Sequence, residues 1–216
     1  MKSVWRFTMS TKEQQVQEMT SKIANFISYM AKVLPDDVQE KIHELAQDEK
    51  NPMAKSIYET MQHNMDLAAQ LNRPSCQDTG VLQFWVKVGS NYPLLGELEE
   101  ILKEATYKAT QEAPLRLNCV ETFDEFNTGT NIGLTAPYIH WDIIPGPYMA
   151  GGGCSLPGSG KTLMPGEGYE GVAKFVLDLM TSYGLNACPP LLVGVGIATT
   201  IDTAAGLSKK ALMRPV

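Results

Sequence analysis

Apolar residues in the first 70 positions recur at intervals of three and four, the spacing that lines one face of an α-helix. The pattern runs over residues 11–46 and is interrupted at Pro35, which two acidic residues follow. Proline and acidic side chains are favoured in the first turn of a helix, so the interruption predicts two successive helices. A third helix is predicted over residues 52–71. We expect the three apolar faces to pack against other parts of the protein. Those of the first and third helices comprise Val16, Met19, Ile23, Phe26, Ile27 and Met30, and Met53, Ile57, Met61, Met65 and Ala68.

The pattern changes after Pro74. Short β-rich runs predict strands over residues 81–88, 138–144 and 191–197, and helical spacing returns over residues 95–112, 169–183 and 200–213. Helices first, with strands and helices mixed later, predict a mixed α+β fold: an N-terminal helical layer followed by a mixed strand/helix region.

Composition narrows the function classes. The formal charge is −6 and no dense Lys/Arg cluster occurs, which argues against nucleic-acid binding. No apolar run is long enough to span a bilayer. Residues 1–10 are mildly basic but lack the apolar core and cleavage site of a signal peptide. These features predict a cytoplasmic enzyme.

Four cysteines, at positions 76, 119, 154 and 188, are dispersed without a C-x-x-C pair. A buried thiol is the default interpretation of such a cysteine. Cys76 begins a polar pentapeptide between a helix end and a predicted strand, where side chains can face a pocket. Cys188 has a related position and precedes two prolines, which suit either a rigid metal ligand or a simple tight turn.

Glycines are concentrated at residues 151–153 and 158–160. Such a segment either presents backbone N–H groups to an anion or is a plain flexible loop, and both interpretations stay open. The run Gly160-Lys161-Thr162 is not a P-loop, because Ser155 stands where that motif requires glycine.

Five ordered blocks carry a family resemblance. They are residues 76–80 (Cys-Gln-Asp-Thr-Gly), 113–116 (Ala-Pro-Leu-Arg), 151–153 (Gly-Gly-Gly), 167–171 (Glu-Gly-Tyr-Glu-Gly) and 186–190 (Asn-Ala-Cys-Pro-Pro). Together they resemble the alpha subunit of the class I iron–sulfur fumarase and tartrate dehydratase family, over residues 11–216. Residues 71–74, 148–154 and 193–199 look closest to the family's L(+)-tartrate dehydratase alpha subunits.

The resemblance implies a 4Fe–4S cluster held by three cysteines, with one iron open to substrate as a Lewis acid. By motif match, Cys76 and Cys188 are two of the ligands. Cys119 and Cys154 match no ligand position and are expected to be buried thiols. No cysteine follows Cys188, so we expect a C-terminally incomplete enzyme domain over residues 11–216, preceded by an extension at residues 1–10.

The resemblance also assigns the remaining site residues. Asp78 and Thr79 are the expected catalytic residues, although the general base is not identified. The expected substrate-binding residues are Gln77, Arg116, Gly152 and Gly153, and the planar arginine fork suits a carboxylate. His140 is interpreted as structural.

The implied reaction is elimination of water from L(+)-tartrate to give oxaloacetate. The implied partner is a beta subunit of the same enzyme, in an α2β2 assembly. The alternatives are a class I fumarate hydratase alpha subunit and a truncated, non-catalytic chain without a cluster. A zinc site is disfavoured, because two cysteines lack a nearby His or Cys.

Overall fold

The computed structural model describes residues 11–76, 79–147, 149–151, 154–155, 158–183 and 190–216. Helices come first and small sheets follow, so the predicted mixed α+β class is confirmed. The chain forms two compact units. The first comprises the described parts of Met1–Leu34 and Ser56–Cys154, and the second those of Pro35–Lys55 and Ser155–Val216.

All three predicted N-terminal helices are present. They are α1 (Lys12–Met30), α2 (Asp36–Asp48) and α3 (Pro52–Leu71). Thr11 and Gln14 cap the start of α1 reciprocally: each side chain accepts a hydrogen bond from the other's backbone N–H, at 3.3 and 2.9 Å. Across the described ranges of the chain, no helix combines the length and the apolar character needed to cross a membrane.

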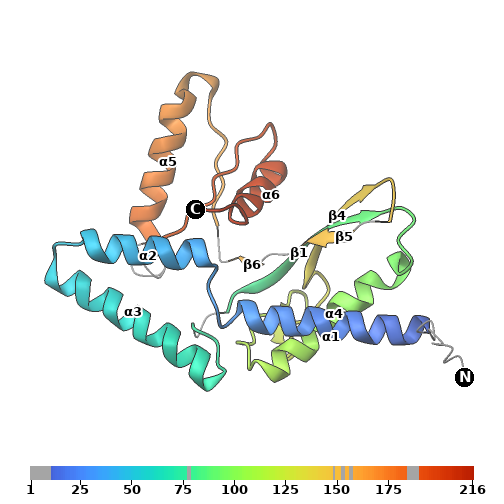
Figure 1. Cartoon of the computed structure of the whole chain (residues 1–216). Coiled ribbons are helices and arrows are strands. Elements are labelled where there is room, and N and C mark those ends of the chain that lie inside the picture. The colour runs from blue at the N-terminus through green and yellow to red at the C-terminus, as the bar shows by residue number, and fades with distance from the viewer. Residues whose placement is uncertain (1–10, 77–78, 148, 152–153, 156–157, 184–189) are drawn as a thin grey trace, which may run out of the picture. The chain divides into compact units, whose positions relative to one another are not determined.

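A small sheet lies at the centre of the first unit, with strand order β4-β1-β5 (Figure 1). The predicted strands β1 (Val81–Gly89) and β4 (Tyr138–Ile144) pair in parallel, and β5 (Met149–Gly151) joins β1 in antiparallel. The short β6 (Cys154–Ser155) also pairs with β1. Parallel neighbours need a crossover connection. That connection contains η1 (Leu95–Glu97) and the predicted helix α4 (Leu98–Glu112).

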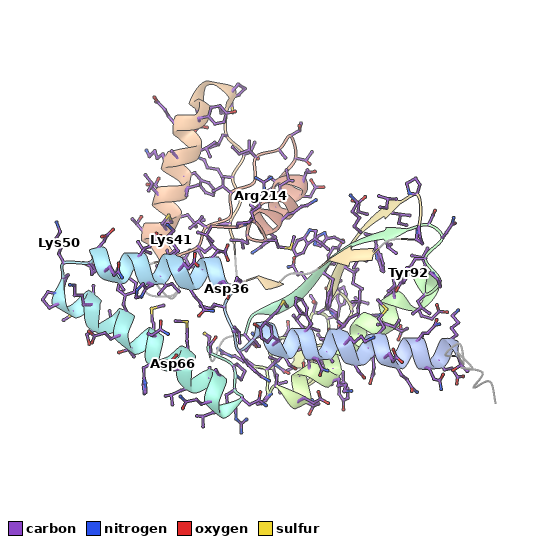
Figure 2. The ribbon with its side chains drawn as sticks, in the orientation of Figure 1. Asp36, Lys41, Lys50, Asp66, Tyr92 and Arg214 are labelled. Carbon is purple, nitrogen blue, oxygen red and sulfur yellow. The ribbon has the colours of Figure 1, made fainter. Side chains whose placement is uncertain are left out.

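The core lies between one face of β1 and the helices α1 and α4, which pack against each other (Figure 1). Strand periodicity explains which residues of β1 belong to the core: alternate residues from Leu82 to Val88 are buried, and those between them are not. Tyr92, labelled in Figure 2, donates its hydroxyl to the Met19 sulfur at 3.4 Å. The members from β1 and α4 include Leu82, Phe84, Val86, Val88, Leu98, Ile101, Leu102 and Ala105.

Two predicted apolar faces are only partly buried. On α1 the buried positions are Thr20, Ala24, Ile27 and Ser28, whereas Phe26 is 52% exposed. The predicted face of α1 is nevertheless largely packed, because Ile27 is buried and Val16, Met19 and Ile23 lie against the core. On α3 only Ala68 is buried, and Met53 is 77% exposed. The expectation that every apolar face packs is therefore wrong for much of α3.

A two-stranded sheet in the first unit was not predicted. It pairs β2 (Val120–Glu121) with β3 (Phe126–Asn127) in antiparallel. Strands of two residues are too short to show an alternating pattern, so no sequence signal was available.

The second unit contains α2, η2 (Pro165–Glu167) and the predicted helices α5 (Gly168–Tyr183) and α6 (Ile201–Ala211). Asp36 and Lys41 on α2, and Arg214 after α6, are labelled in Figure 2. The Asp37 carboxylate accepts a hydrogen bond from the Val216 N–H at 3.0 Å. This bond joins the start of α2 to the segment after α6 within the unit.

The prediction of a strand over residues 191–197 is wrong, because this segment is not part of a sheet. It lies against α6 instead. A Cβ atom on Gly194 would stand 2.2 Å from the Ser208 carbonyl oxygen, and one on Gly196 would stand 2.1 Å from that of Ala204. The segment thus packs against helix α6, whereas its β-rich composition predicted that it would pair with another strand.

Candidate functional site

The segment that carries Cys76 connects α3 to β1 in the first unit. The residue before it is held on two sides: the Ser75 N–H donates to the Ala31 carbonyl at 3.0 Å, and the Asn64 amide donates to the Ser75 carbonyl at 2.5 Å. Cys76 itself is half-buried. Its anchored neighbour therefore holds a partly accessible residue in the segment that follows α3.

Thr79 and Gly80 lie beside the segment that carries Arg116. The Thr79 hydroxyl oxygen accepts a hydrogen bond from the Arg116 N–H at 3.1 Å. Further along the two segments, the Asn118 side-chain amide donates to the Gly80 carbonyl at 3.0 Å. Two of the five sequence blocks, 37 residues apart at this contact, thus meet as neighbouring segments.

The Arg116 side chain is exposed, while Leu115 before it is buried. A buried apolar neighbour anchors the backbone, and Arg116 itself is exposed, so a small anion can reach it. This arrangement suits recognition of a carboxylate, because arginine offers two parallel donors.

Asn131 belongs to the same framework, and sequence reasoning missed it. Its side-chain carbonyl accepts from the N–H groups of Asn118 and Cys119, at 2.9 and 3.3 Å. Its amide donates to the Arg116 carbonyl at 3.0 Å and to the Thr110 hydroxyl at 3.2 Å. The only available signal was an asparagine in a Gly-Thr-Asn run, a residue type that tolerates the positive φ of 58° found there.

Cys119 contrasts with Cys76. It is 5% exposed, so the prediction of a buried thiol is confirmed. Burial raises the pKa of the Cys119 thiol, the Glu121 charge adds to that shift, and a hydrogen bond with Thr128 opposes it. Because the thiolate is the form that binds metal, this environment disfavours Cys119 as a ligand. The Cys154 side chain lies outside the described residues.

His140 on β4 stacks on Trp85 of β1, with ring centroids 4.4 Å apart and planes 8° from parallel. Tyr138 contacts the same imidazole edge-on at 4.8 Å. Burial lowers the pKa of His140, so the neutral ring is favoured. These ring contacts agree with a structural interpretation of His140.

Five predicted site residues lie outside the described residues: Gln77, Asp78, Gly152, Gly153 and Cys188. Among the residues that are described, no group of three or more His, Cys, Asp or Glu side chains is arranged to hold a metal ion. Cys76 does fit the requirement for one thiolate ligand of an iron–sulfur cluster, because its thiol is partly accessible and its segment adjoins Arg116 through Thr79.

Comparison with known proteins gives a consistent result. Residues 20–216 match the family described as fumarate hydratase (Fumerase). The chain is 55% identical to the L(+)-tartrate dehydratase subunit alpha of Escherichia coli K12 over 214 residues, covering 96% of this chain and 71% of that protein. It is 36% identical to the putative L(+)-tartrate dehydratase subunit alpha of Methanocaldococcus jannaschii over 194 residues, covering 85% of this chain and 68% of that protein.

Proposed function

Because this chain belongs to the fumarate hydratase family, whose members are hydro-lyases that use iron–sulfur chemistry, we propose that it is the alpha subunit of an L(+)-tartrate dehydratase. The enzyme removes a proton from one carbon of tartrate and hydroxide from its neighbour. The resulting enol tautomerises to oxaloacetate, so atoms balance with one water released. The observation that carries the substrate assignment is the 55% identity to the Escherichia coli subunit across 96% of this chain.

In this proposal Arg116 binds a substrate carboxylate. The hydrogen bond from its backbone N–H to Thr79 supports this role, because it fixes the backbone position from which the exposed side chain would contact the substrate. Gln77 and the N–H groups of Gly152 and Gly153 complete the dianion site; their assignment rests on the sequence blocks.

Thr79 and Asp78 are the proposed catalytic residues. The Thr79 hydroxyl oxygen accepts the Arg116 N–H, so Thr79 lies where the segment that follows Cys76 meets the proposed substrate-binding segment. Asp78, by its position between Gln77 and Thr79, handles a proton or orients the group that does.

Cys76 and Cys188 are the proposed cluster ligands on this chain. When bound, the cluster supplies a Lewis-acidic iron for the leaving hydroxyl. Dispersed thiols that serve as ligands require a reducing compartment, which favours the cytoplasm. The relatives are named as alpha subunits, and we propose a beta subunit as partner in an α2β2 assembly.

The test compares L(+)-tartrate with malate and fumarate on anaerobically reconstituted holoenzyme. We expect oxaloacetate from L(+)-tartrate at the highest kcat/KM. The family description itself favours the second candidate, a fumarate hydratase, and a higher kcat/KM on malate or fumarate would establish that assignment instead.

A colourless protein after reconstitution with iron and sulfide, inactive on all three substrates, would contradict both enzyme assignments. It would favour the non-catalytic alternative. Iron and sulfide content per chain is the direct measurement.

A further inference from the structure

The Arg116 backbone is held from two sides. Its N–H donates to the Thr79 hydroxyl at 3.1 Å, and its carbonyl accepts from the Asn131 amide at 3.0 Å. We propose that Asn131 is a positioning residue that fixes the substrate-binding Arg116 against Thr79. This inference rests on the proposed function, because it assumes that Arg116 binds the substrate carboxylate.

The bonding of the Asn131 side chain supports this role. A primary amide offers two acceptor lone pairs and two N–H donors. Asn131 directs its oxygen to the N–H groups of Asn118 and Cys119, and its nitrogen to Arg116 and Thr110. One half-buried side chain therefore holds the backbone of Arg116, Asn118 and Cys119.

The contact with Thr110 connects this framework to a rigid element. Thr110 is 3% exposed on α4, and its hydroxyl donates to the Thr106 carbonyl at 2.8 Å. The same hydroxyl oxygen accepts from Asn131 at 3.2 Å. The Arg116 segment is thus positioned from the packed helix through Asn131.

Asn118 extends the framework to the segment after Cys76, because its amide donates to the Gly80 carbonyl at 3.0 Å. Asn131 holds the Asn118 N–H in turn, at 2.9 Å. Loss of the Asn131 amide should let the Arg116 and Thr79 positions separate. Binding of a carboxylate by the two parallel N–H donors of an arginine is weakened by displacements of about 0.5–1 Å.

Two substitutions separate the donor and acceptor functions. Asn131→Asp keeps the acceptor and tolerates positive φ, but it removes both donations and places a carboxylate near the Arg116 carbonyl. Asn131→Gly keeps the backbone conformation and removes every side-chain bond. If one variant fails to fold, the other still tests the proposal.

Asn127→Asp is the matched control. Asn127 is the last residue of β3; its side chain donates to the Leu117 carbonyl at 2.6 Å and accepts from the Gly129 N–H at 2.8 Å. The Asn127→Asp substitution also removes an amide donor, in this case one that bonds the carbonyl of Leu117, the residue after Arg116. A purely structural effect of lost amide bonds should appear in this variant as well.

The experiment measures KM and kcat of the holoenzyme on L(+)-tartrate and malate, with cluster content and hydrogen exchange of the peptide containing residues 115–119. For both Asn131 variants we expect KM to rise about tenfold, because a displaced Arg116 should lose roughly one hydrogen bond to the substrate carboxylate. Cluster content should be unchanged, and residues 115–119 should exchange faster. Asn127→Asp should change KM less than about twofold.

An unchanged KM in the Asn131 variants, or an equal rise in Asn127→Asp, would overturn the proposal. Turnover of malate in place of tartrate would refute the proposed substrate, and the KM comparison would then be made on malate. If the wild-type protein acts on neither substrate, the proposed function fails; exchange still tests the positioning, which is refuted if all three variants exchange alike.

Discussion

At the scale of single residues, Cys76 and Cys119 show how environment separates two identical side chains. Cys119 is packed in the first unit, and burial raises its thiol pKa. Cys76 is half-buried in a segment that meets Arg116 through Thr79. The two thiols lie in the same unit, yet only Cys76 has the accessibility of a ligand.

This contrast predicts different outcomes for two conservative substitutions. Cys76→Ser should abolish assembly of the cluster, because a thiolate ligand is removed. Cys119→Ser should retain cluster content within about twofold, although it should lower stability by roughly 1–3 kcal/mol by burying a more polar group. Iron, sulfide and visible absorbance after anaerobic reconstitution measure the first effect, and thermal unfolding measures the second. Full cluster content in Cys76→Ser would refute the ligand assignment.

Arg116 gives a prediction on substrate binding. Arg116→Lys keeps the charge but loses the planar pair of donors, so we expect KM for L(+)-tartrate to rise by about ten- to a hundredfold, equivalent to roughly 1.4–2.8 kcal/mol. Stability should be unaffected, because the side chain is exposed. Arg73→Lys, a conservative change outside the proposed site, is the control for steady-state kinetics. Equal KM values for wild type and Arg116→Lys would contradict the carboxylate role.

His140 gives a prediction on pH dependence. Burial holds its pKa below the ordinary value of 6.5, so the unfolded chain binds a proton more readily than the folded one. The stability contribution of His140 is therefore present above that ordinary value and is lost as pH falls below it towards the lower folded pKa.

His140→Phe keeps a ring against Trp85 and removes the titration. The loss of thermal stability between about pH 7.5 and pH 5.5 should be smaller in the variant than in the wild type. Unfolding midpoints at the two pH values provide the measurement. Identical losses in both proteins would show that His140 does not contribute to the acid sensitivity.

At the scale of elements, α4 positions the candidate site. Its apolar face packs on β1 and α1, and Thr110 near its end bonds Asn131. The segment with Arg116 follows directly after the helix, so its starting point is set by core packing. Strand β1 likewise begins one residue after Gly80. The two site segments are thus extensions of the two elements that share the core.

Burial predicts a large difference in stability between two variants in which a large apolar side chain is shortened to alanine. Leu98 on α4 is fully buried, so Leu98→Ala should destabilise the protein by about 2–5 kcal/mol. Met53→Ala on α3 should change stability by less than about 0.5 kcal/mol, because that side chain is largely exposed. Denaturant unfolding monitored by circular dichroism compares the two. Equal effects would contradict the described packing of α4.

At the scale of the whole molecule, the sequence blocks that resemble the family fall in the ranges of two compact units. Cys76, Thr79, Arg116 and Asn131 belong to the first, and the Cys188 block lies in the range of the second. The two proposed ligands, Cys76 and Cys188, come from separate parts of the sequence.

The proposed partnership gives a prediction at this scale. Co-expressed alpha and beta subunits should elute as one complex whose mass corresponds to two copies of each. Light scattering coupled to gel filtration measures that mass, and the alpha chain alone provides the control. Separate elution of the two subunits would contradict the α2β2 proposal.

The amino-acid sequence by itself determined most helices and the principal strands, because α1 to α6 and β1 and β4 have long apolar patterns of clear period. It failed at residues 191–197, where a β-rich composition cannot reveal that two glycines lie against a helix. On α1 it identified most of the packed side chains, among them Ile27 and Met19, but it missed Ala24.

For the site, the sequence blocks named Cys76, Thr79 and Arg116, but only the tertiary structure brought Thr79 and Arg116 into contact. Asn131 became recognisable in the same way, because a side chain that bonds distant backbone atoms leaves no periodic signal in sequence. Local patterns record which residues prefer a helix or a strand. Tertiary structure decided which segments meet, since hydrogen bonds between residues far apart in the chain form only when the core has placed them.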